Sequence, residues 1–196
     1  MAEMINKKKL IIGVDIGLMG AIACIDEDGK FVGVWDTPIN KVTKLVGKKG
    51  KEVEKHVSVY NISAIRLVLS SLVAHYAMYD FKCFIEEALI IMGGGKKRFN
   101  VKTNVSLARC QGIFEGVSMS YGMDPSTVDP RIWQKYFGIS GKKGDTGDQS
   151  IIIANSLFPT VEFKTKRGRK LDGRADALLL AYYGVQTMKN EFTHAV

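Results

Sequence analysis

Short apolar runs separated by turn residues dominate the first third of the chain. Three such runs occupy residues 10–17, 20–29 and 30–38, and the second ends in Asp-Glu-Asp-Gly. Apolar runs of this length, bounded by Gly, Asp and Pro, are typical of β-strands, and Asp-Gly is a hairpin turn signal. The pattern therefore predicts an antiparallel three-stranded meander over residues 10–38.

Beyond residue 58 the spacing of the apolar positions alternates between that of helices and that of strands. Within residues 58–80 the helical spacing begins at Ile62 and continues to Tyr76. Further strands are expected at 82–91 and 126–130, and further helices at 104–122, 131–138, 150–158 and about 173–189, with Thr103 or Asn104 capping the first of them. This order predicts an α/β protein with a mixed sheet and helices on its faces.

Lysine-rich segments separate several of these elements. Residues 40–57 contain two glycines and are expected to form a mobile basic loop. Two other basic clusters run from Lys96 to Lys102 and from Lys164 to Arg174. Isolated lysines usually belong to a solvated surface. Clusters on loops beside carboxylate-bearing elements are instead expected to contact phosphates, which gives affinity without sequence readout.

The length and net charge of the chain limit the number of domains and the kind of binding partner that can be expected. A length of 196 residues suffices for one sizeable core, and no internal repeat is present, so residues 1–196 are expected to form a single domain. The net charge of +8 and the pI near 9.3 favour a polyanionic partner, nucleic acid before membrane. A basic protein without a polyanionic partner could have the same net charge. Charge alone therefore does not distinguish such a protein from one that binds nucleic acid.

Three cysteines, Cys24, Cys83 and Cys110, lie far apart and form no metal-binding or redox motif. We interpret them as reduced core residues of a protein in a reducing compartment. No apolar run is long and uncharged enough to cross a bilayer, and Asp15 interrupts the N-terminal run that might otherwise resemble a signal peptide. The sequence therefore predicts a cytoplasmic protein without a membrane partner.

Acidic residues interrupt three segments that otherwise have a buried pattern. Asp15 lies in the first strand, Glu86 and Glu87 lie in the 82–91 strand, and Asp172 and Asp176 begin the apolar last helix. Each alone has an ordinary explanation, such as a helix cap, an outward-facing strand residue or a buried ion pair. Adjacent strand residues point to opposite faces, so one of Glu86 and Glu87 should face the interior, and periodicity leaves open which.

Carboxylates converging from different elements suit hard cations such as Mg²⁺ or Mn²⁺. Two such ions about 4 Å apart can hold the attacking and leaving oxygens of a phosphoryl displacement. They would also offset the repulsion between the acids and bind a nucleic acid phosphate. The acids and the basic charge thus predict a metal-dependent enzyme acting on nucleic acid.

The motifs GVDIG around Asp15, FIEEA around Glu86 and ADALLLA around Asp176 resemble those of RuvC-type Holliday-junction resolvases, including bacteriophage members, within the RNase H-like superfamily. The resemblance runs from about residue 10 to residue 184. It implies an RNase H-like mixed five-stranded sheet flanked by helices. It also implies a homodimeric crossover-junction endodeoxyribonuclease of DNA recombination and repair, in a bacterial cell or phage-infected host. Such an enzyme nicks four-way and related branched DNA symmetrically, leaving 5′-phosphate and 3′-hydroxyl ends.

Carried over position by position, the resemblance assigns catalysis and two Mg²⁺ (or Mn²⁺) ions to the carboxylates of Asp15, Glu86 and Asp176, together with Asp172 from the helix start. Phosphate contacts are expected from two basic loops, through Lys96, Lys97, Arg98, Lys142 and Lys143.

Two positions depart from the family pattern. Gly173 stands three residues before Asp176, where bacterial members commonly have an acid or a histidine. Leu89 stands three residues after Glu86, where the family has an aromatic residue thought to open base pairs at the junction centre. Phe99 in the basic loop is a candidate replacement for that aromatic residue. The preferred cleavage sequence, the dimer surface and the role of Asp172 therefore stay open.

Three rival functions fit parts of the pattern. The segment 14–29 is similar to the phosphate hairpin of sugar kinases and actin-like ATPases, but those enzymes have two lobes and a longer chain. Another RNase H-like nuclease, for example one that cuts RNA–DNA hybrids, would carry the same acids. A non-catalytic junction-binding protein would gain nothing from buried negative charge, and metal-dependent turnover would separate it from a nuclease.

Overall fold

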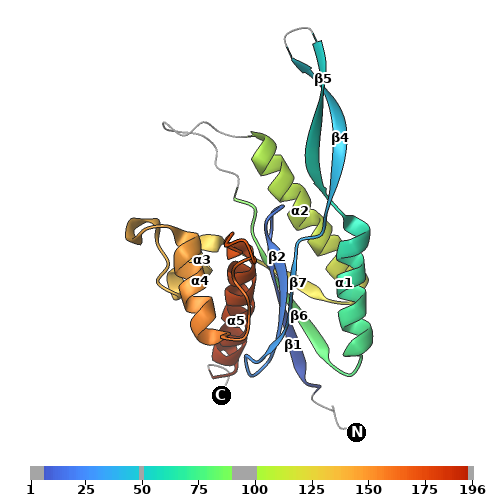
Figure 1. The fold of residues 1–196 in the computed structure, drawn as a ribbon. Helices are drawn as coiled ribbons and strands as arrows, with labels where there is room; N and C mark the ends of the chain where they lie inside the picture. The colour runs from blue at the N-terminus through green and yellow to red at the C-terminus, as the bar shows by residue number, and fades with distance from the viewer. Residues whose placement is uncertain (1–6, 49–50, 90–100, 194–196) are drawn as a thin grey trace.

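A five-stranded mixed sheet forms the centre of the molecule (Figure 1). The computed structural model describes residues 7–48, 51–89 and 101–193. The strands of the sheet, in spatial order, are β3 (Phe31–Asp36), β2 (Ala21–Asp26), β1 (Lys9–Asp15), β6 (Asp80–Glu86) and β7 (Asp124–Val128). The first three form the predicted antiparallel meander, and β1, β6 and β7 run parallel to one another. The predicted fold class is thereby confirmed.

Helices cover both faces of this sheet. The helices are α1 (Ile62–His75) and α2 (Val101–Ser120) on one face, with α3 (Pro130–Tyr136), α4 (Thr146–Leu157) and α5 (Asp172–Thr193) on the other, and a short 3-10 turn, η1 (Gly141–Lys143), precedes α4. Strand alternation divides the core accordingly: Ile12 and Val14 pack toward α1 and α2, whereas Ile11 packs toward α5. Each helix is thus held by the apolar positions on one face of the sheet.

Helix α5 approaches the sheet unusually closely because small residues line the contact. A Cβ atom at Gly13 of β1 would lie 2.1 Å from the carbonyl oxygen of Ala177 and 2.9 Å from the Cβ of Ala181. Further along the helix, a Cβ at Gly184 would lie 2.4 Å from the ring of Phe84. Such distances exclude any larger side chain at either glycine. The start of α5 is therefore held directly over the ends of β1 and β6.

The basic segment predicted as a loop over residues 40–57 is instead a two-stranded antiparallel ribbon. Its strands are β4 (Ile39–Lys48) and β5 (Lys51–Tyr60), which pair along their whole length. The physical reason lies in the sequence: β-branched residues such as Val53, Val57 and Val59 recur with the two-residue period of a strand, and glycine-containing residues link the two runs. The many lysines concealed this alternation.

Smaller differences concern element boundaries. Helix α2 already includes Thr103 and Asn104, so neither is its cap, and β6 ends at Glu86 rather than residue 91. Helix α4 begins four residues earlier than expected because Asp145 caps it, its side chain accepting a hydrogen bond from the Asp148 N–H at 3.0 Å. The three cysteines are buried and unpaired, as expected. In the described part of the chain no helix is long and apolar enough to cross a membrane.

Candidate active site

Two of the predicted acids end neighbouring parallel strands. Asp15 is the last residue of β1 and Glu86 the last residue of β6, and the register pairs their predecessors, Val14 and Ile85. Asp15 lies two residues after Gly13, and Glu86 two residues after Phe84, so each acid is on the same face of its strand as that residue. This is the face of the sheet that α5 covers. The structure thus places Glu86 beside Asp15. Glu87 is exposed, and its backbone N–H donates to Val128 at 2.9 Å.

The other two acids occupy the start of α5. Asp176 lies in the second turn and is partly buried, whereas Asp172 is exposed at the first residue. Between them, Gly173 faces the β1–β2 turn so closely that a Cβ there would lie 2.3 Å from the Met19 carbonyl oxygen. The same Cβ would lie 2.9 Å from Asp15 Oδ2. An acid or histidine therefore has no room at position 173 in this arrangement.

An ion pair fixes the first turn of α5 to the sheet. Arg174 Nε donates to Asp36 Oδ1 at 2.6 Å and Nη2 donates to Oδ2 at 3.1 Å, a bidentate contact with the end of β3. Nearby, Lys170 forms an ion pair with Asp148 of α4. These two cations of the 164–174 cluster therefore have structural partners. That the 164–174 cluster contacts phosphate stays a prediction.

The carboxylates at the strand ends resist ionisation. Burial raises the pKa of Asp15 well above its usual range, and the charges of Glu86, Asp176 and Asp172 raise it further. Burial, followed by the charge of Asp176, raises the pKa of Glu86 to about 8. The indole N–H of Trp133 opposes part of this rise, although the two groups do not form a hydrogen bond.

The pKa of Asp176 is raised in the same way. Burial and then the charge of Asp172 raise its pKa to about 7, with the Ser150 hydroxyl acting in the opposite direction. Among the causes of the Asp15 shift no cation appears, and the described ion pairs involve none of Asp15, Glu86 and Asp176. An ionised carboxylate here has no basic partner, which makes its charged form costly in a buried site.

The donor set suits a divalent cation. The Asp176 Oδ1 atom is buried and has no hydrogen-bond partner among the described residues. Carboxylate oxygens are the ligands that Mg²⁺ and Mn²⁺ prefer, and an unpartnered buried oxygen is available for such a bond. Within the described ranges, no three acidic, histidine or cysteine side chains converge closely enough to hold one ion in their present rotamers. Ligation by three carboxylates therefore requires side-chain rotation.

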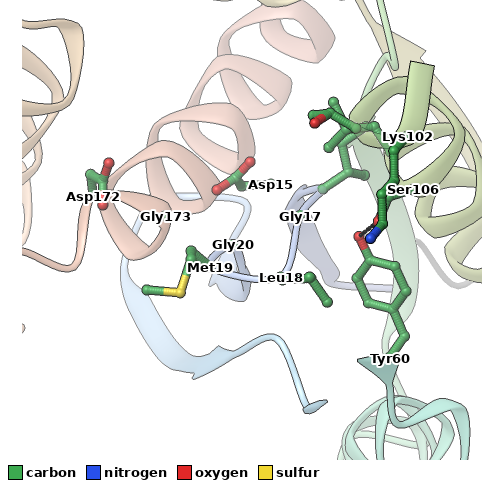
Figure 2. Close-up of a pocket in the computed structure, with 13 residues that line it drawn as sticks. Asp15, Gly17, Leu18, Met19, Gly20, Tyr60, Lys102, Ser106, Asp172 and Gly173 are labelled. Atoms are coloured by element: carbon green, nitrogen blue, oxygen red, sulfur yellow. Dashed lines mark hydrogen bonds between the residues drawn. The ribbon is translucent and has the colours of Figure 1, made fainter. Parts of the chain in front are cut away.

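A cavity of about 400 Å³ opens beside Asp15 (Figure 2). The β1–β2 turn, the first turns of α2, the end of β5 and the start of α5 enclose it. Its polar lining includes Lys102, Ser106 and Tyr60, whose hydroxyl lies 3.2 Å from Ser106 Oγ. Asp172 stands at the opposite side of the cavity from Tyr60. The cavity thus carries acid on one wall and hydroxyl and amino groups on the other.

The basic residues predicted to contact phosphate lie in two separate segments of the chain. Lys142 and Lys143 lie in the 3-10 turn before α4, both exposed, and Lys143 Nζ donates to the Gly138 carbonyl at 3.1 Å. Helix α4 then brings Gly147 against Asp172, since a Cβ at Gly147 would lie 3.1 Å from Asp172 Oδ2. Leu89 is half-buried beyond the end of β6. The other predicted contacts, Lys96, Lys97, Arg98 and Phe99, lie outside the described residues.

Several residues of this site were not predicted. Trp133 and Ser150 reach the carboxylates from α3 and α4, and Tyr60 and Ser106 reach the cavity from β5 and α2. Their sequence neighbourhoods resemble ordinary amphipathic segments, so no motif marks them. The one available signal was the polar atom of Trp133 in an amphipathic segment, because the indole N–H of a tryptophan on a buried helix face needs a partner.

Comparison with known proteins identifies a protein family for this chain. The sequence matches the model of the family described as Lactococcus phage M3 protein over residues 37–183. The chain belongs to this phage protein family. A search of curated proteins gives no significant match.

Among solved structures, the chain of this M3 protein family member is similar to T. thermophilus RuvC in complex with Holliday junction substrate. The TM-score is 0.50 at 11% identity, and the match covers 93% of this chain and 96% of the RuvC chain. A second Thermus thermophilus RuvC structure gives a TM-score of 0.46 at 12% identity, covering 92% and 96% of the two chains. The first comparison establishes a RuvC-like fold over nearly the whole chain, as the sequence motifs predicted.

Proposed function

We propose that this protein is a divalent-metal-dependent endonuclease that resolves four-way and related branched DNA junctions by paired, symmetric nicks. The observation that carries the proposal is a group of mutually repelling, partly buried carboxylates in a RuvC-like fold: Asp15 and Glu86 at adjacent strand ends, and Asp176 near the start of α5. The similar RuvC structure holds a Holliday junction substrate. The chain's net charge of +8 also favours a polyanionic substrate.

In this proposal Asp15, Glu86 and Asp176 hold two Mg²⁺ or Mn²⁺ ions, and Asp172 contributes from the exposed helix start. Such ions, when bound, lower the pKa of water and stabilise the charge that develops on the phosphate. The protein itself contributes by holding the three carboxylates in position. Strand ends β1 and β6 fix Asp15 and Glu86 side by side, and the glycine contacts of α5 hold Asp176 above them.

Phosphate contacts are assigned to exposed lysines around this site. Lys142 and Lys143 precede the helix that contacts Asp172, and Lys102 lines the cavity beside Asp15. Phosphate contacts by Lys96, Lys97 and Arg98, which precede α2 in the sequence, remain proposed on sequence grounds. Such contacts would position the strand without reading its sequence.

Paired nicks require two active sites, and we propose a homodimer. Its support is an exposed stripe along α2, at three- and four-residue spacing, formed by Val101, Val105, Ala108, Gly112, Gly116 and Met119. A Cβ at Gly112 or Gly116 would meet nothing within 4 Å. A helix face of small and apolar residues left open in one chain suits close packing against a second helix.

A strand-resolved cleavage assay on a fixed four-way junction tests the function, with Mg²⁺ and with EDTA. We expect symmetric, metal-dependent nicks from the wild type and a loss of about a hundredfold or more in rate for Asp176→Asn, with junction binding kept. Asp124→Asn, at an exposed carboxylate of β7, is the matched control and should cut normally.

A linear duplex and an RNA–DNA hybrid are run beside the junction. Preferential cleavage of the hybrid would keep the metal site and replace the junction as substrate. Tight junction binding without metal-dependent cleavage would identify a non-catalytic binding protein and contradict the proposal. Wild-type cleavage rates for Asp176→Asn would show that the carboxylate group is not the active site.

A further inference from the structure

The β4–β5 ribbon begins at the edge of the sheet that carries the candidate active site. Asp15 pairs with Ala21, and Ala21 pairs with Asp36, so the ends of β1 and β3 lie at the same edge. The ribbon starts three residues after Asp36, at Ile39, and returns at Tyr60, which lines the cavity beside Asp15. A substrate lying over the carboxylates therefore passes the base of the ribbon.

Hydrogen bonds hold that base in place. The backbone N–H of Thr37 donates to Gly20 at 2.9 Å, and the backbone N–H of Asn61 donates to Pro38 at 2.9 Å. The Asn61 side chain donates to Asn40 Oδ1 at 3.0 Å. From this anchored base the ribbon extends away from the sheet and its helices (Figure 1). These contacts attach the base of the ribbon to the end of the sheet where the acids lie.

The two faces of the ribbon differ in charge. The register pairs Lys44 directly with Lys55, on the face that also carries Val42 and Val57. Both glutamates of the ribbon belong to the opposite face, where Glu54 pairs with Leu45 and Glu52 with Gly47. The backbone register also places Lys48 opposite Lys51. Among the paired residues that the structure describes, no lysine therefore lies directly opposite an acid.

This arrangement costs stability in the isolated chain. Like charges directly opposite on two strands are destabilising, and a lone two-stranded ribbon is only marginally stable in water. Lys44 and Lys55 form no ion pair with any described residue, and Lys41 belongs to the opposite face, with the glutamates. A polyanion lying along the lysine face would relieve the repulsion, because it supplies the missing negative charge.

The charge and length of the ribbon match duplex DNA. Residues 39–60 contain six lysines and two glutamates, so this segment supplies half of the chain's net charge of +8. Ten residues per strand, at about 3.4 Å each, give a reach on the order of 30 Å. One turn of B-form DNA is about 34 Å long. The ribbon can therefore follow a duplex arm for nearly one turn beyond the cleavage site.

We propose that the lysine face of the β4–β5 ribbon binds the phosphate backbone of a duplex DNA arm that leaves the active site. The inference rests on the proposed nuclease function for the identity of the substrate. It assigns to Lys44 and Lys55 a role in affinity and arm placement, without base readout. The competing explanation is that these lysines only protect exposed strand edges from pairing with other chains.

The test compares Lys44→Gln/Lys55→Gln with Lys30→Gln/Lys82→Gln, which removes the same charge from exposed positions in the β2–β3 turn and on β6. Binding to four-way junctions is measured in EDTA over a series of salt concentrations, with arms of about 6 and about 15 base pairs. Removing Lys44 and Lys55 relieves a like-charge pair, so the ribbon should keep its fold, which circular dichroism and thermal unfolding verify.

For the ribbon variant we expect the slope of log Kd against log salt to fall by about two, because each lost phosphate contact contributes about 0.9. The wild type should bind long-armed junctions more tightly than short-armed ones, and the variant should lose that difference. The control pair should retain both properties. Short-armed junctions should still be cut in Mg²⁺ at the wild-type rate at saturating enzyme.

An unchanged slope and an unchanged arm-length effect in the ribbon variant would overturn the inference and leave the nuclease function standing. Failure of the nuclease function alone gives a different result. If the wild type cuts no DNA, yet the ribbon variant loses salt-dependent affinity for long arms, the ribbon binds DNA and the nuclease function fails. If the wild type binds no DNA in any form, the ribbon inference is overturned as well.

Discussion

Gly173 shows how a single residue shapes the candidate site. A side chain at this position would meet the Met19 carbonyl oxygen and Asp15 Oδ2, because α5 starts directly against the β1–β2 turn. The close approach also brings Asp176 over the strand ends. The RuvC-type pattern predicts an acid or histidine here, and the backbone contact explains why this chain has neither. The nearest acid, Asp172, lies one residue further out and is exposed.

We expect Gly173→Ala to lower the free energy of unfolding by about 1–3 kcal/mol, the usual cost of overpacking. Urea denaturation measures it, with Gly141→Ala as the matched control, because a Cβ at Gly141 meets nothing within 4 Å. The control should change stability by less than about 0.5 kcal/mol. Equal stability of the two variants would show that α5 does not pack this closely against the turn.

At the scale of elements, the site depends on three segments that meet at one edge. Strands β1 and β6 supply Asp15 and Glu86, and α5 supplies Asp176, so the three charges come together only when the helix docks on the sheet. Docking buries carboxylates whose pKa values are near 4 in the unfolded chain. The folded protein therefore holds protons that the unfolded chain has already released at neutral pH.

This proton uptake gives stability a definite pH dependence. The pKa of Glu86 rises to about 8 and that of Asp176 to about 7 on folding. A group with a raised folded pKa stabilises the protein fully below its unfolded pKa and loses that contribution as pH rises through the folded value. In EDTA we therefore expect the free energy of unfolding to fall between about pH 5 and pH 8.

Urea denaturation at several pH values in EDTA measures this trend. Asp176→Asn removes one of the titrating groups and should show a shallower fall over the same range. The Asp124→Asn control should follow the wild type. A wild-type stability that is flat or rises from pH 5 to pH 8 would contradict the clustering of these carboxylates.

For the whole molecule, the distribution of charge is the main feature. The chain is strongly basic overall, yet its acids gather at one edge of the sheet and half of its net positive charge belongs to the segment that forms the ribbon. A cation bound at the acidic edge would be linked to global stability, since the unfolded chain does not bring the acids together.

We expect Mn²⁺ or Mg²⁺ to stabilise the folded protein, by about 2.7 kcal/mol when free metal exceeds its Kd a hundredfold. The stabilisation should be larger at pH 8 than at pH 5.5, because protons compete for the carboxylates at the lower pH. Thermal unfolding at fixed protein concentration measures the shift in Tm, with NaCl of equal ionic strength as control. An equal shift in Asp176→Asn would place the metal elsewhere.

The sequence by itself determined most of the order of the elements and the candidate residues of the site. The short apolar runs bounded by turn residues over residues 10–38, and the helical and strand spacings from Ile62 onward, predicted the mixed sheet. Acids inside buried patterns marked Asp15, the pair Glu86 and Glu87, and the pair Asp172 and Asp176, because burial and charge conflict within a few neighbouring residues. Such local conflicts are visible without a structure.

Only the tertiary structure decided how these parts meet. The parallel register of β1 and β6 placed Glu86, rather than Glu87, beside Asp15. The pairing of β4 with β5 turned an expected loop into a ribbon and placed Lys44 and Lys55 on the face opposite to its glutamates. Contacts between residues distant in sequence, such as Gly173 with Met19, depend on docking geometry. No local pattern encodes that geometry, because it arises from the packing of the whole core.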